Sequence, residues 1–457
     1  MQTIVIVGGG AGGLELATRL GDSVGKAGKA HVVLVDRWPA HFWKPLLHTV
    51  ASGKRDARAT EIDYAAQACE HGFQFQRGEL RNLDRERRCL LLAPVLADDG
   101  TEILPERTVH YDRLVLALGS VTNFFGVPGA AEHVLTLDDV PQAQAFQQRF
   151  IDGCIQASAR QDVDGSGSGS GRDPGLDIVI VGGGATGVEL AAELAHSART
   201  LARYKVHALD PVKHVRIRIV ERGSLLLPHL HPRLSKHAAR HLRALGIRIC
   251  LDTAVARVEP DAVIDTEGRV LASSITLWAA GVEAPQLCAS FGLAINSMRQ
   301  IMVGPTLQSL DDPAIYALGD CASFICPVQG RVPPRAQAAH QQALFLAHHL
   351  AQHVAQHLPQ HSAQPVQWAA RRASSAAPGF AYCDYGSLIS LGPHAGVGAI
   401  NATMGGRKLQ VRGALARWLY ALMYRKHLMA LHGFVRMAAR TVADWIAAKI
   451  SPSVRLH

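Results

Sequence analysis

The sequence IVIVGGGA occurs twice in this chain, at residues 4–11 and again at residues 178–185. In both copies a short run of β-branched residues precedes the glycines, and a helix-forming run follows them, LELATRL in the first copy and VELAAEL in the second. This order predicts a buried parallel strand, a tight turn and a helix. Since each copy opens an α/β unit, we expect an α/β fold with two such domains in the 457 residues.

The glycines of both copies follow the spacing Gly-x-Gly-x-x-Gly, which is typical of dinucleotide-binding turns. The first glycine permits the turn, the second lets the backbone approach a pyrophosphate, and the third lets the helix pack on the strand. The N–H groups at the helix N-terminus then attract the phosphates. The candidate binding residues are Gly8, Gly10, Gly12 and Gly13 in the first copy, and Gly182, Gly184, Thr186 and Gly187 in the second.

An acidic residue ends the next predicted strand after each glycine turn. AHVVLVD ends at Asp36, and VRIRIVE ends at Glu221 after a longer insertion. An acid at this position hydrogen-bonds a ribose hydroxyl and repels the 2′-phosphate of NADP. Glu221 therefore favours NADH at the second site, and the neighbouring Arg222 weakens that preference. Two complete fingerprints indicate two dinucleotides, or a dinucleotide and a flavin.

Two further predicted strands end in small residues. YDRLVLALGS contains Ala117 and Gly119, and LWAAGV contains Ala280 and Gly281. Such turns let the backbone pass close to a cofactor, although an ordinary strand end has the same composition.

IYALGDCAS at 315–323 gives the chain a resemblance to the pyridine-nucleotide–flavin oxidoreductases with two dinucleotide-binding domains. The resemblance implies that the first site holds FAD non-covalently, that Asp320 binds its ribityl chain, and that NADH binds the second site as a substrate. It implies two Rossmann-like domains, the second inserted in the first. The expected parts are a discontinuous FAD domain at 1–120 and 300–380, an NADH domain at 121–299 with a flexible Gly/Ser loop at 161–175, and a C-terminal strand and amphipathic-helix region at 381–457.

The cysteines do not follow the pattern of the disulfide reductases in that family. Those enzymes carry a Cys-x4-Cys pair after the first fingerprint, where this chain reads DRWPAHFWKPLLHTV. Cys321 and Cys326 have the same spacing, but they directly follow Asp320, and we interpret them as unrelated thiols. We therefore expect an electron acceptor that needs no thiol relay.

HFWKPLLH, GGGATGVELAAEL, VPPRAQAAHQ and YGSLISL together resemble type II NADH dehydrogenase, a single-chain, non-proton-pumping NADH:quinone oxidoreductase of bacterial respiratory membranes. The resemblance covers nearly the whole chain. It implies hydride transfer from NADH to FAD and then two-electron reduction of ubiquinone or menaquinone. It places Ala336, Gln337, His340 and Gln341 at the quinone, and Ala336, Gln337, Lys44 and Pro45 beside the flavin.

The residues alone leave several of these roles open. Gln337 and Gln341 lie four residues apart on one predicted helix face, where two amides hold a carbonyl or simply form a polar surface. The resemblance makes Glu189 an NADH-site residue and a proton relay, whereas a first-turn acid also interacts with the helix dipole. Lys44 either stabilises negative charge on reduced flavin or is a surface lysine. We take Glu189, Gln337, Gln341 and Lys44 as the catalytic candidates.

The chain from residue 413 onward predicts two amphipathic helices separated by a break at His432–Gly433. Basic amphipathic helices with tryptophan favour the headgroup layer of an anionic membrane. Alternatively, these helices cover another part of the protein or form the interface of a homodimer. The apolar stripes are Leu415, Trp418, Leu419, Leu422 and Met429 in the first helix, and Phe434, Ala438, Val442, Trp445 and Ile446 in the second.

The charge and the N-terminus agree with a peripheral membrane protein. The formal charge is +9, no apolar run reaches about 18 residues, and MQTIVIVGG enters a strand without a targeting segment. With the resemblance, this predicts the cytoplasmic face of a bacterial inner membrane.

We expect neither nucleic acid nor a metal among the partners. No nucleic-acid-binding motif is present. His349, His353 and His357 are spaced like ligands but lack an accompanying carboxylate or thiol, so we interpret them as a solvated helix face. Two alternative functions stay open, a flavoprotein reductase of a soluble protein carrier and a low-turnover NADH-sensing flavoprotein.

Overall fold

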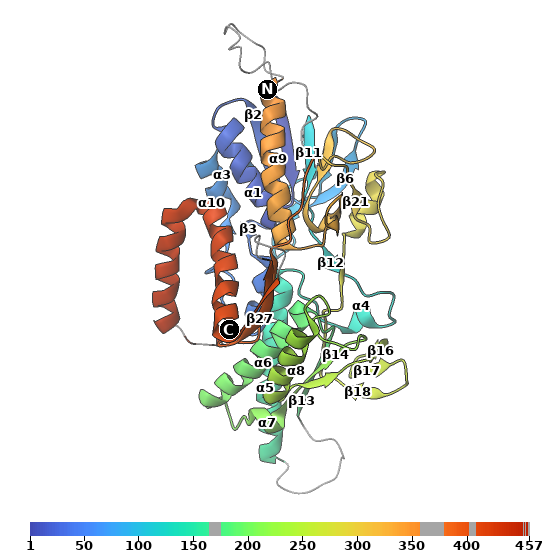
Figure 1. The fold of residues 1–457 in the computed structure, drawn as a ribbon, viewed down its shortest axis with the longest axis vertical. Helices are drawn as coiled ribbons and strands as arrows, with labels where there is room; N and C mark the ends of the chain where they lie inside the picture. Colours follow the sequence, from blue (N-terminus) through green and yellow to red (C-terminus); the bar gives the residue numbers. More distant parts are fainter. Residues whose placement is uncertain (164–174, 357–378, 402–407, 451, 453, 456–457) are drawn as a thin grey trace. The chain divides into compact units, whose positions relative to one another are not determined.

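The computed structural model describes residues 1–163, 175–356, 379–401, 408–450, 452 and 454–455 (Figure 1). It divides into two compact units. Unit 1 comprises Met1–Phe42, Glu61–Val121 and Glu283–Asp384, and unit 2 comprises Trp43–Thr60, Thr122–Val282 and Tyr385–His457. The expected Gly/Ser loop at 161–175 falls almost entirely outside the described residues.

Unit 1 is built on a five-stranded parallel sheet in the order β22-β11-β1-β2-β5. The central strand, QTIVIV, is buried along its last four residues, as its β-branched composition predicts. Val7 lies beside both Leu116 and Val35 in the register, so the carboxyl ends of three strands meet at one edge. The strands are β1 (Gln2–Val7), β2 (Ala30–Asp36), β5 (Gln74–Arg77), β11 (Arg113–Leu116) and β22 (Ile315–Ala317).

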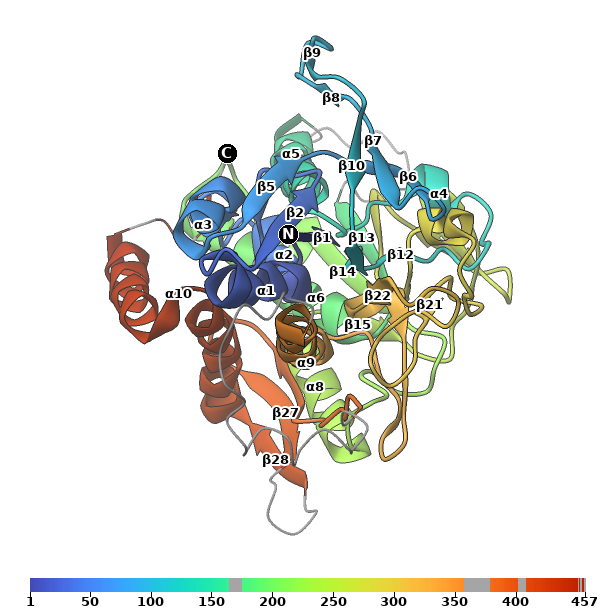
Figure 2. The same ribbon diagram turned by 90° about the horizontal axis from the view of Figure 1, so that it is seen from above.

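Helices α1 (Ala11–Leu20) and α9 (Ala336–Gln356) pack against each other in unit 1. An antiparallel sheet of β6 (Leu80–Asp84), β7 (Cys89–Leu92) and β10 (Arg107–His110) carries the extended hairpin β8 (Val95–Leu96) and β9 (Glu102–Leu104), which is plain in Figure 2. The other elements of unit 1 are η1 (Gly21–Gly25), β3 (Ala40–His41), β4 (Ile62–Asp63), α3 (Tyr64–His71), η3 (Gln286–Phe291), β21 (Ile301–Met302), η4 (Gly319–Cys321), β23 (Ala322–Ser323), β24 (Ile325–Cys326) and β25 (Gly330–Arg331).

Unit 2 repeats the arrangement of unit 1. Its four-stranded parallel sheet has the order β15-β14-β13-β19, which matches β5-β2-β1-β11 strand for strand. The strands are β13 (Leu176–Val181), β14 (Val215–Val220), β15 (Arg248–Cys250) and β19 (Ile275–Trp278). The duplicated sequence therefore yields a duplicated sheet.

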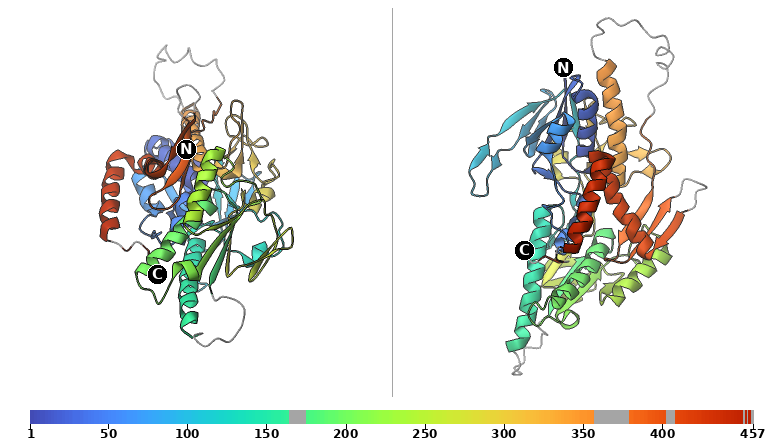
Figure 3. Two further views of the ribbon diagram at one scale, coloured as in Figure 1. Left: turned by 60° about the horizontal axis from the view of Figure 1, so that its bottom comes forward. Right: turned by 90° about the vertical axis from the view of Figure 1, so that its left-hand side faces the viewer.

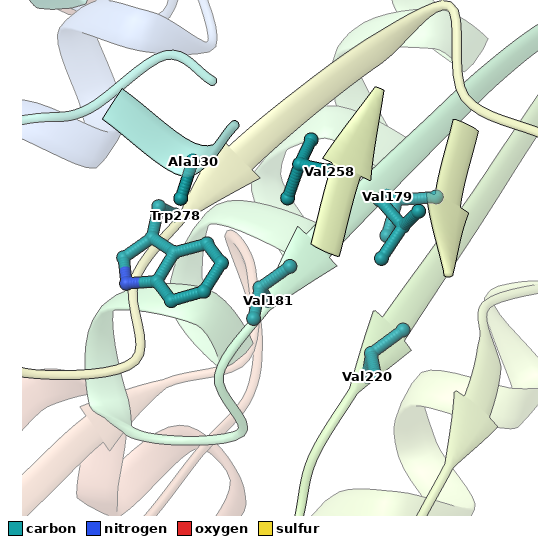
Figure 4. Packing of buried hydrophobic residues seen from close by; sticks show 7 residues of the cluster. Ala130, Val179, Val181, Val220, Val258 and Trp278 are labelled. Carbon is teal, nitrogen blue, oxygen red and sulfur yellow. The ribbon is translucent and has the colours of Figure 1, made fainter. Parts of the chain in front are cut away.

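An apolar cluster joins the parallel sheet of unit 2 to the antiparallel sheet of β16 (Val255–Glu259), β17 (Ala262–Asp265) and β18 (Val270–Ala272). Val179, Val181 and Trp278 meet Val258 there, as Figure 4 shows. The helices of unit 2 are η2 (Lys44–Leu46), α2 (Leu47–Ala51), α4 (Ala130–His133), α5 (Val140–Val163), α6 (Ala185–Arg203), α7 (Pro211–His214) and α8 (Pro232–Ala244). The short strands β12 (Val121–Thr122) and β20 (Val282–Glu283) lie where the chain passes between units.

The C-terminal part of unit 2 contains an antiparallel sheet of β26 (Gly386–Ser390), β27 (Gly396–Asn401) and β28 (Lys408–Arg412), which packs against α10 (Gly413–Ile450) (Figure 3). Gly433 has φ 74° and ψ 175°, so α10 is two helices joined at a bend. The predicted break at this glycine is confirmed. In the described part of the chain, no helix has the length and apolarity to cross a bilayer.

The two halves of α10 differ in what they bury. The first half buries Ala416, Leu428 and Leu431, although it leaves Leu415 and Trp418 exposed, at 56% and 57%. The second half leaves large apolar side chains exposed, with Phe434 at 70% and Trp445 at 60%. The second half therefore presents an apolar surface that unit 2 does not cover.

Candidate functional site

The first glycine turn lies at the carboxyl end of β1. A Cβ atom on Gly8 would lie 2.3 Å from the carbonyl oxygen of Ala117, and one on Gly13 would lie 1.9 Å from that of Gly8. Gly8 also has φ +103°, which a side chain rarely adopts. A Cβ atom on Gly12 would lie 2.5 Å from a methyl carbon of the Leu318 side chain. Gly8 and Gly13 therefore require glycine because backbone atoms surround them.

Gly10 has a different environment from the other glycines of the turn. A Cβ atom there would meet no atom within 4 Å, and Gly10 is the N-cap residue of α1, where no side chain caps the helix. Open space thus lies in front of N–H groups that have no partner within the helix. The arrangement fits an anionic pyrophosphate.

Asp36 stabilises this turn from the end of β2. Its Oδ2 accepts a hydrogen bond from the Gly9 amide at 2.6 Å, and its Oδ1 accepts one from the Trp38 amide at 2.8 Å. Burial raises the pKa of Asp36, against the lowering effect of the two amides. Tyr64 Oη donates to the carbonyl of Gly9 at 2.8 Å, and His41 Nδ1 lies 2.9 Å from the same oxygen. Tyr64 and His41 were not among the predicted site residues, because no motif in the sequence marks them.

Asp320 follows β22, in the same sheet as the glycine turn. Its Oδ2 accepts from Ser120 Oγ at 2.7 Å, and its backbone oxygen accepts from Gln300 Nε2 at 2.8 Å. Ser120 follows the Ala117–Gly119 turn of β11, and Gly119 has φ +70° and open space at its Cβ position. The structure thus brings these predicted residues together at one edge of the sheet of unit 1. They fit a flavin dinucleotide.

The second glycine turn has the same construction. A Cβ atom on Gly182, which has φ +113°, would lie 2.5 Å from the oxygen of Ala279. One on Gly187 would lie 2.1 Å from the oxygen of Gly182, whereas Gly184 faces open space at the start of α6. Thr186 is exposed in the first turn of that helix.

Glu221 repeats the role of Asp36. Its Oε2 accepts from the Gly183 amide at 2.6 Å, and its Oε1 accepts from the Gly223 amide at 2.7 Å. Ala280 and Gly281 follow β19 on the other side of β13. We call each glycine turn with its acid and the neighbouring small-residue turn a cradle. The first cradle consists of residues 8–13, Asp36 and residues 117–119, and the second consists of residues 182–187, Glu221 and residues 280–281. Both cradles have all three parts.

Glu189 is buried on α6, with 6% of its surface exposed. Its Oε1 accepts from the Ser390 amide at 2.9 Å, Tyr420 is a further hydrogen-bond partner, and His48 Nδ1 lies 3.6 Å from Oε2. Burial raises the pKa of Glu189 to about 8 and lowers that of His48 to about 4. At neutral pH Glu189 is therefore mostly protonated and His48 neutral, so the pair is not a salt bridge.

The candidate glutamines lie at the start of α9. Gln337 Nε2 donates to Asp384 Oδ1 at 3.0 Å. Gln341 exchanges two hydrogen bonds with the backbone of Cys383, at 2.8 and 2.9 Å. Both amides therefore contact the segment 383–384, and Ala336, half-buried, begins the same helix.

His340 contacts α1 instead. Its Nδ1 lies 2.6 Å from Glu15 Oε2, and Arg19 Nε lies 2.9 Å from Glu15 Oε1. The Glu15 side chain is fully buried, so its charge needs these two partners. His340 therefore links α9 to the helix that begins at the first glycine turn.

Lys44 and Pro45 begin η2 in unit 2, whereas the other predicted flavin residues lie in unit 1. Lys44 Nζ lies 3.4 Å from Asp138 Oδ1. The side chain of Lys44 is 41% exposed, so solvent weakens this pair.

Comparison with known proteins identifies the family. A family model described as pyridine nucleotide-disulphide oxidoreductase matches residues 2–343. The type II NADH:quinone oxidoreductase of Haemophilus influenzae is 36% identical over 463 aligned positions, which cover 100% of both chains. This chain belongs to the type II NADH:quinone oxidoreductases. The resemblance drawn from the motifs is confirmed.

Other relatives of this family agree. The Mycobacterium tuberculosis type II NADH:quinone oxidoreductase Ndh is 26% identical, over 98% of this chain and 88% of its own. Among solved structures, Plasmodium falciparum NDH2 in complex with NADH superposes with a TM-score of 0.75 at 19% identity, over 99% of this chain and 100% of its own. The predicted fold class is thereby confirmed.

The cysteines of this type II enzyme are not paired. All eight are free thiols, and Cys321 and Cys326 are buried. Burial raises the pKa of Cys321, whose thiol donates to the carbonyls of Leu116 and Leu318. A buried thiol with a raised pKa is a poor nucleophile. Among the described residues no three metal-ligating side chains gather, and His357 lies outside those residues.

Proposed function

We propose that this protein oxidises NADH at the second cradle and reduces a membrane quinone, with FAD held non-covalently by the first cradle. The observation that carries the proposal is the presence of two complete dinucleotide cradles in a chain that matches a type II NADH:quinone oxidoreductase over its full length. FAD, when bound, accepts the hydride and passes on two electrons.

The residues of each cradle have defined tasks. In the first, the space at Gly10 admits the pyrophosphate of FAD, and Asp36 and Asp320 hold its ribose and ribityl hydroxyls. In the second, Gly184 takes the same position for NADH, and Glu221 favours a free 2′-hydroxyl over a phosphate.

Glu189 is the proposed proton donor to the quinone. Reduction of a quinone by two electrons consumes two protons, and a general acid works best when its pKa is close to the working pH. The pKa of about 8 leaves a proton on the Glu189 carboxyl at neutral pH. The hydrogen bonds from Ser390 and Tyr420 hold that carboxyl in one orientation.

We assign quinone recognition to the start of α9. A side-chain amide has two N–H donors and one oxygen acceptor. Gln341 uses one N–H and its oxygen on Cys383, which leaves an N–H for a quinone carbonyl. His340 holds the same helix turn against Glu15.

The second half of α10 is the proposed membrane contact. Its exposed apolar side chains suit the boundary between headgroups and acyl chains, and the formal charge of +9 attracts anionic lipid. We place the enzyme as a peripheral protein on the cytoplasmic face of a bacterial inner membrane.

The test is an assay with purified, FAD-loaded protein, NADH and a short-chain quinone, followed by NADH absorbance. Sustained NADH loss that depends on quinone is the expected result. Turnover only with a soluble protein carrier would replace the proposal with the carrier reductase. Absence of turnover with both cofactors bound would replace it with the NADH sensor.

A further inference from the structure

Phe125 combines backbone strain with exposure. It has φ +54°, a left-handed conformation that is unfavourable for a bulky side chain. Its side chain is 50% exposed, so only part of the ring is buried against the protein. A strained backbone at a partly exposed aromatic residue motivates a search for a binding role.

The ring of Phe125 contacts the end of β19. A Cβ atom on Gly281 would lie 2.7 Å from Cζ of Phe125, so a side chain at this position would displace the ring. The Asn123 amide donates to the carbonyl of Gly281 at 3.0 Å, and Trp278 Nε1 donates to the carbonyl of Asn123 at 2.9 Å. These bonds fix the segment that carries Phe125.

Arg222 reaches the same ring from the end of β14. Its guanidinium carbon lies 5.9 Å from the centroid of the Phe125 ring, within cation–π range. Arg222 directly follows Glu221, whose two carboxylate oxygens accept from the amides of Gly183 and Gly223. Within the described chain, no ion pair to Arg222 occurs.

The strand order places this pair at the second glycine turn. β14 and β19 flank β13 in the sheet, and the turn Gly182–Gly184 follows β13. A contact that joins residue 222 to the surroundings of Gly281 must therefore pass over the end of β13. A guanidinium stacked on an aromatic ring keeps its N–H edge available for phosphate oxygens.

We propose that Phe125 and Arg222 form a clasp that binds the pyrophosphate of the dinucleotide substrate from the side opposite the N-terminus of α6. Phe125 supports the guanidinium, and Arg222 supplies the charge and the N–H donors. The proposal rests on NADH binding at the second cradle. Arg222 thereby has a task in binding NADH itself, besides any effect on discrimination against NADPH.

The test measures flavin reduction by NADH in FAD-loaded variants under anaerobic rapid mixing. Arg222→Gln is expected to raise the apparent Kd for NADH about tenfold or more, since it removes a charge-assisted contact, and to leave the limiting reduction rate nearly unchanged. Arg222→Gln is also expected to weaken the dependence of that Kd on salt concentration. The matched control is Arg257→Gln, an exposed arginine of the same unit, which is expected to change neither quantity.

Phe125→Gly gives a readout that a purely structural role would not produce. Glycine relieves the positive φ, so the thermal midpoint should not fall, while the Kd for NADH rises severalfold. Combining Arg222→Gln with Phe125→Gly should raise the Kd for NADH by much less than the product of the two single increases, because both residues act as one clasp. With reduced nicotinamide mononucleotide, which lacks the adenylate half, Arg222→Gln should have a smaller effect.

An unchanged Kd for NADH in both Arg222→Gln and Phe125→Gly would overturn the clasp. So would a thermal midpoint that falls in step with the loss of binding in Phe125→Gly. If wild-type flavin is not reduced by NADH at all, the proposed function fails first, and the two failures are therefore distinguishable.

Discussion

Glu189 and His48 show how burial sets the charge of a site residue. Each side chain is almost completely buried, and each is driven toward its neutral form, the acid by a raised pKa and the imidazole by a lowered one. The sequence placed Glu189 near the start of a helix, where an exposed acid interacts with the dipole. The structure instead surrounds it with Ser390, Tyr420 and His48, which come from three distant segments.

A pH-dependent stability follows from the raised pKa of Glu189. Because the folded protein holds this proton more tightly than the unfolded chain, the stabilisation is present below the unfolded pKa of 4.5 and is lost as the pH rises through about 8. His48 opposes this only below its unfolded pKa of 6.5. Between pH 6.5 and 8 wild type should therefore lose stability relative to Glu189→Gln, by at most about 1.4 kcal/mol per pH unit. Parallel thermal midpoints for the two proteins across that window would contradict the raised pKa.

The activity of Glu189→Gln tests the proton-donor role. We expect the quinone-dependent rate to fall about a hundredfold, since a general acid contributes factors of that order. In wild type that rate should decline as the pH passes about 8, and the decline should vanish in the variant. Flavin reduction by NADH serves as the internal control and should be unaffected. Equal losses in both half-reactions would assign Glu189 to the fold or to NADH binding instead.

At the scale of elements, the two cradles are copies of one design. In each, an acid at the carboxyl end of the second strand accepts a hydrogen bond from the amide of the middle glycine of the turn, Gly9 or Gly183, at 2.6 Å in both cases. Each leaves the second glycine of the motif facing open space at the start of a helix. The copies differ in their surroundings, since Asp320 belongs to the first cradle and the Phe125–Arg222 pair to the second.

Alanine substitutions at Gly10 and Gly184 should show which glycine turn binds FAD and which binds NADH. Neither Gly10→Ala nor Gly184→Ala meets protein atoms, so both variants should fold, but each methyl group occupies pyrophosphate space. Gly10→Ala should purify with little FAD, whereas Gly184→Ala should keep FAD and raise the KM for NADH at least tenfold. Absorbance of the bound flavin and steady-state kinetics check both. Loss of FAD in Gly184→Ala alone would reverse the assignment of the cradles.

The elements predicted from sequence were those with local signals. The spacing of hydrophobic residues and of glycines predicted both strand–turn–helix units. It also predicted a helix at α9 and a break at Gly433, and the structure has all of these elements. Side chains that act across long sequence separations carry no such signal. His340 was predicted for its position between two glutamines, yet its contact with Glu15 on α1 depends on how two helices pack.

At the scale of the whole molecule, the second half of α10 leaves large apolar side chains exposed, Phe434 and Trp445 among them. An exposed apolar patch is typical of an interaction surface. A bilayer is the partner that we propose for it, because long-chain quinones reside in the lipid.

Substitution of that surface should weaken membrane binding without loss of soluble activity. Phe434→Ser with Trp445→Ser should reduce co-flotation with phosphatidylglycerol vesicles several-fold, and high salt should reduce wild-type binding as well. Activity with a short-chain quinone should be retained. The control is Val212→Ser with Val270→Ser, which removes exposed apolar side chains elsewhere in unit 2. Equal effects of the two double variants would argue against a specific membrane contact.

The most direct test of the whole account is a sequential anaerobic experiment on the FAD-loaded enzyme. Mixing with one equivalent of NADH should bleach the flavin absorbance in a single turnover, and a second mix with a short-chain quinone should restore it without any added thiol or protein. Restoration that requires a protein carrier, or a flavin that NADH does not bleach, would contradict the assignment of this chain as an NADH:quinone oxidoreductase.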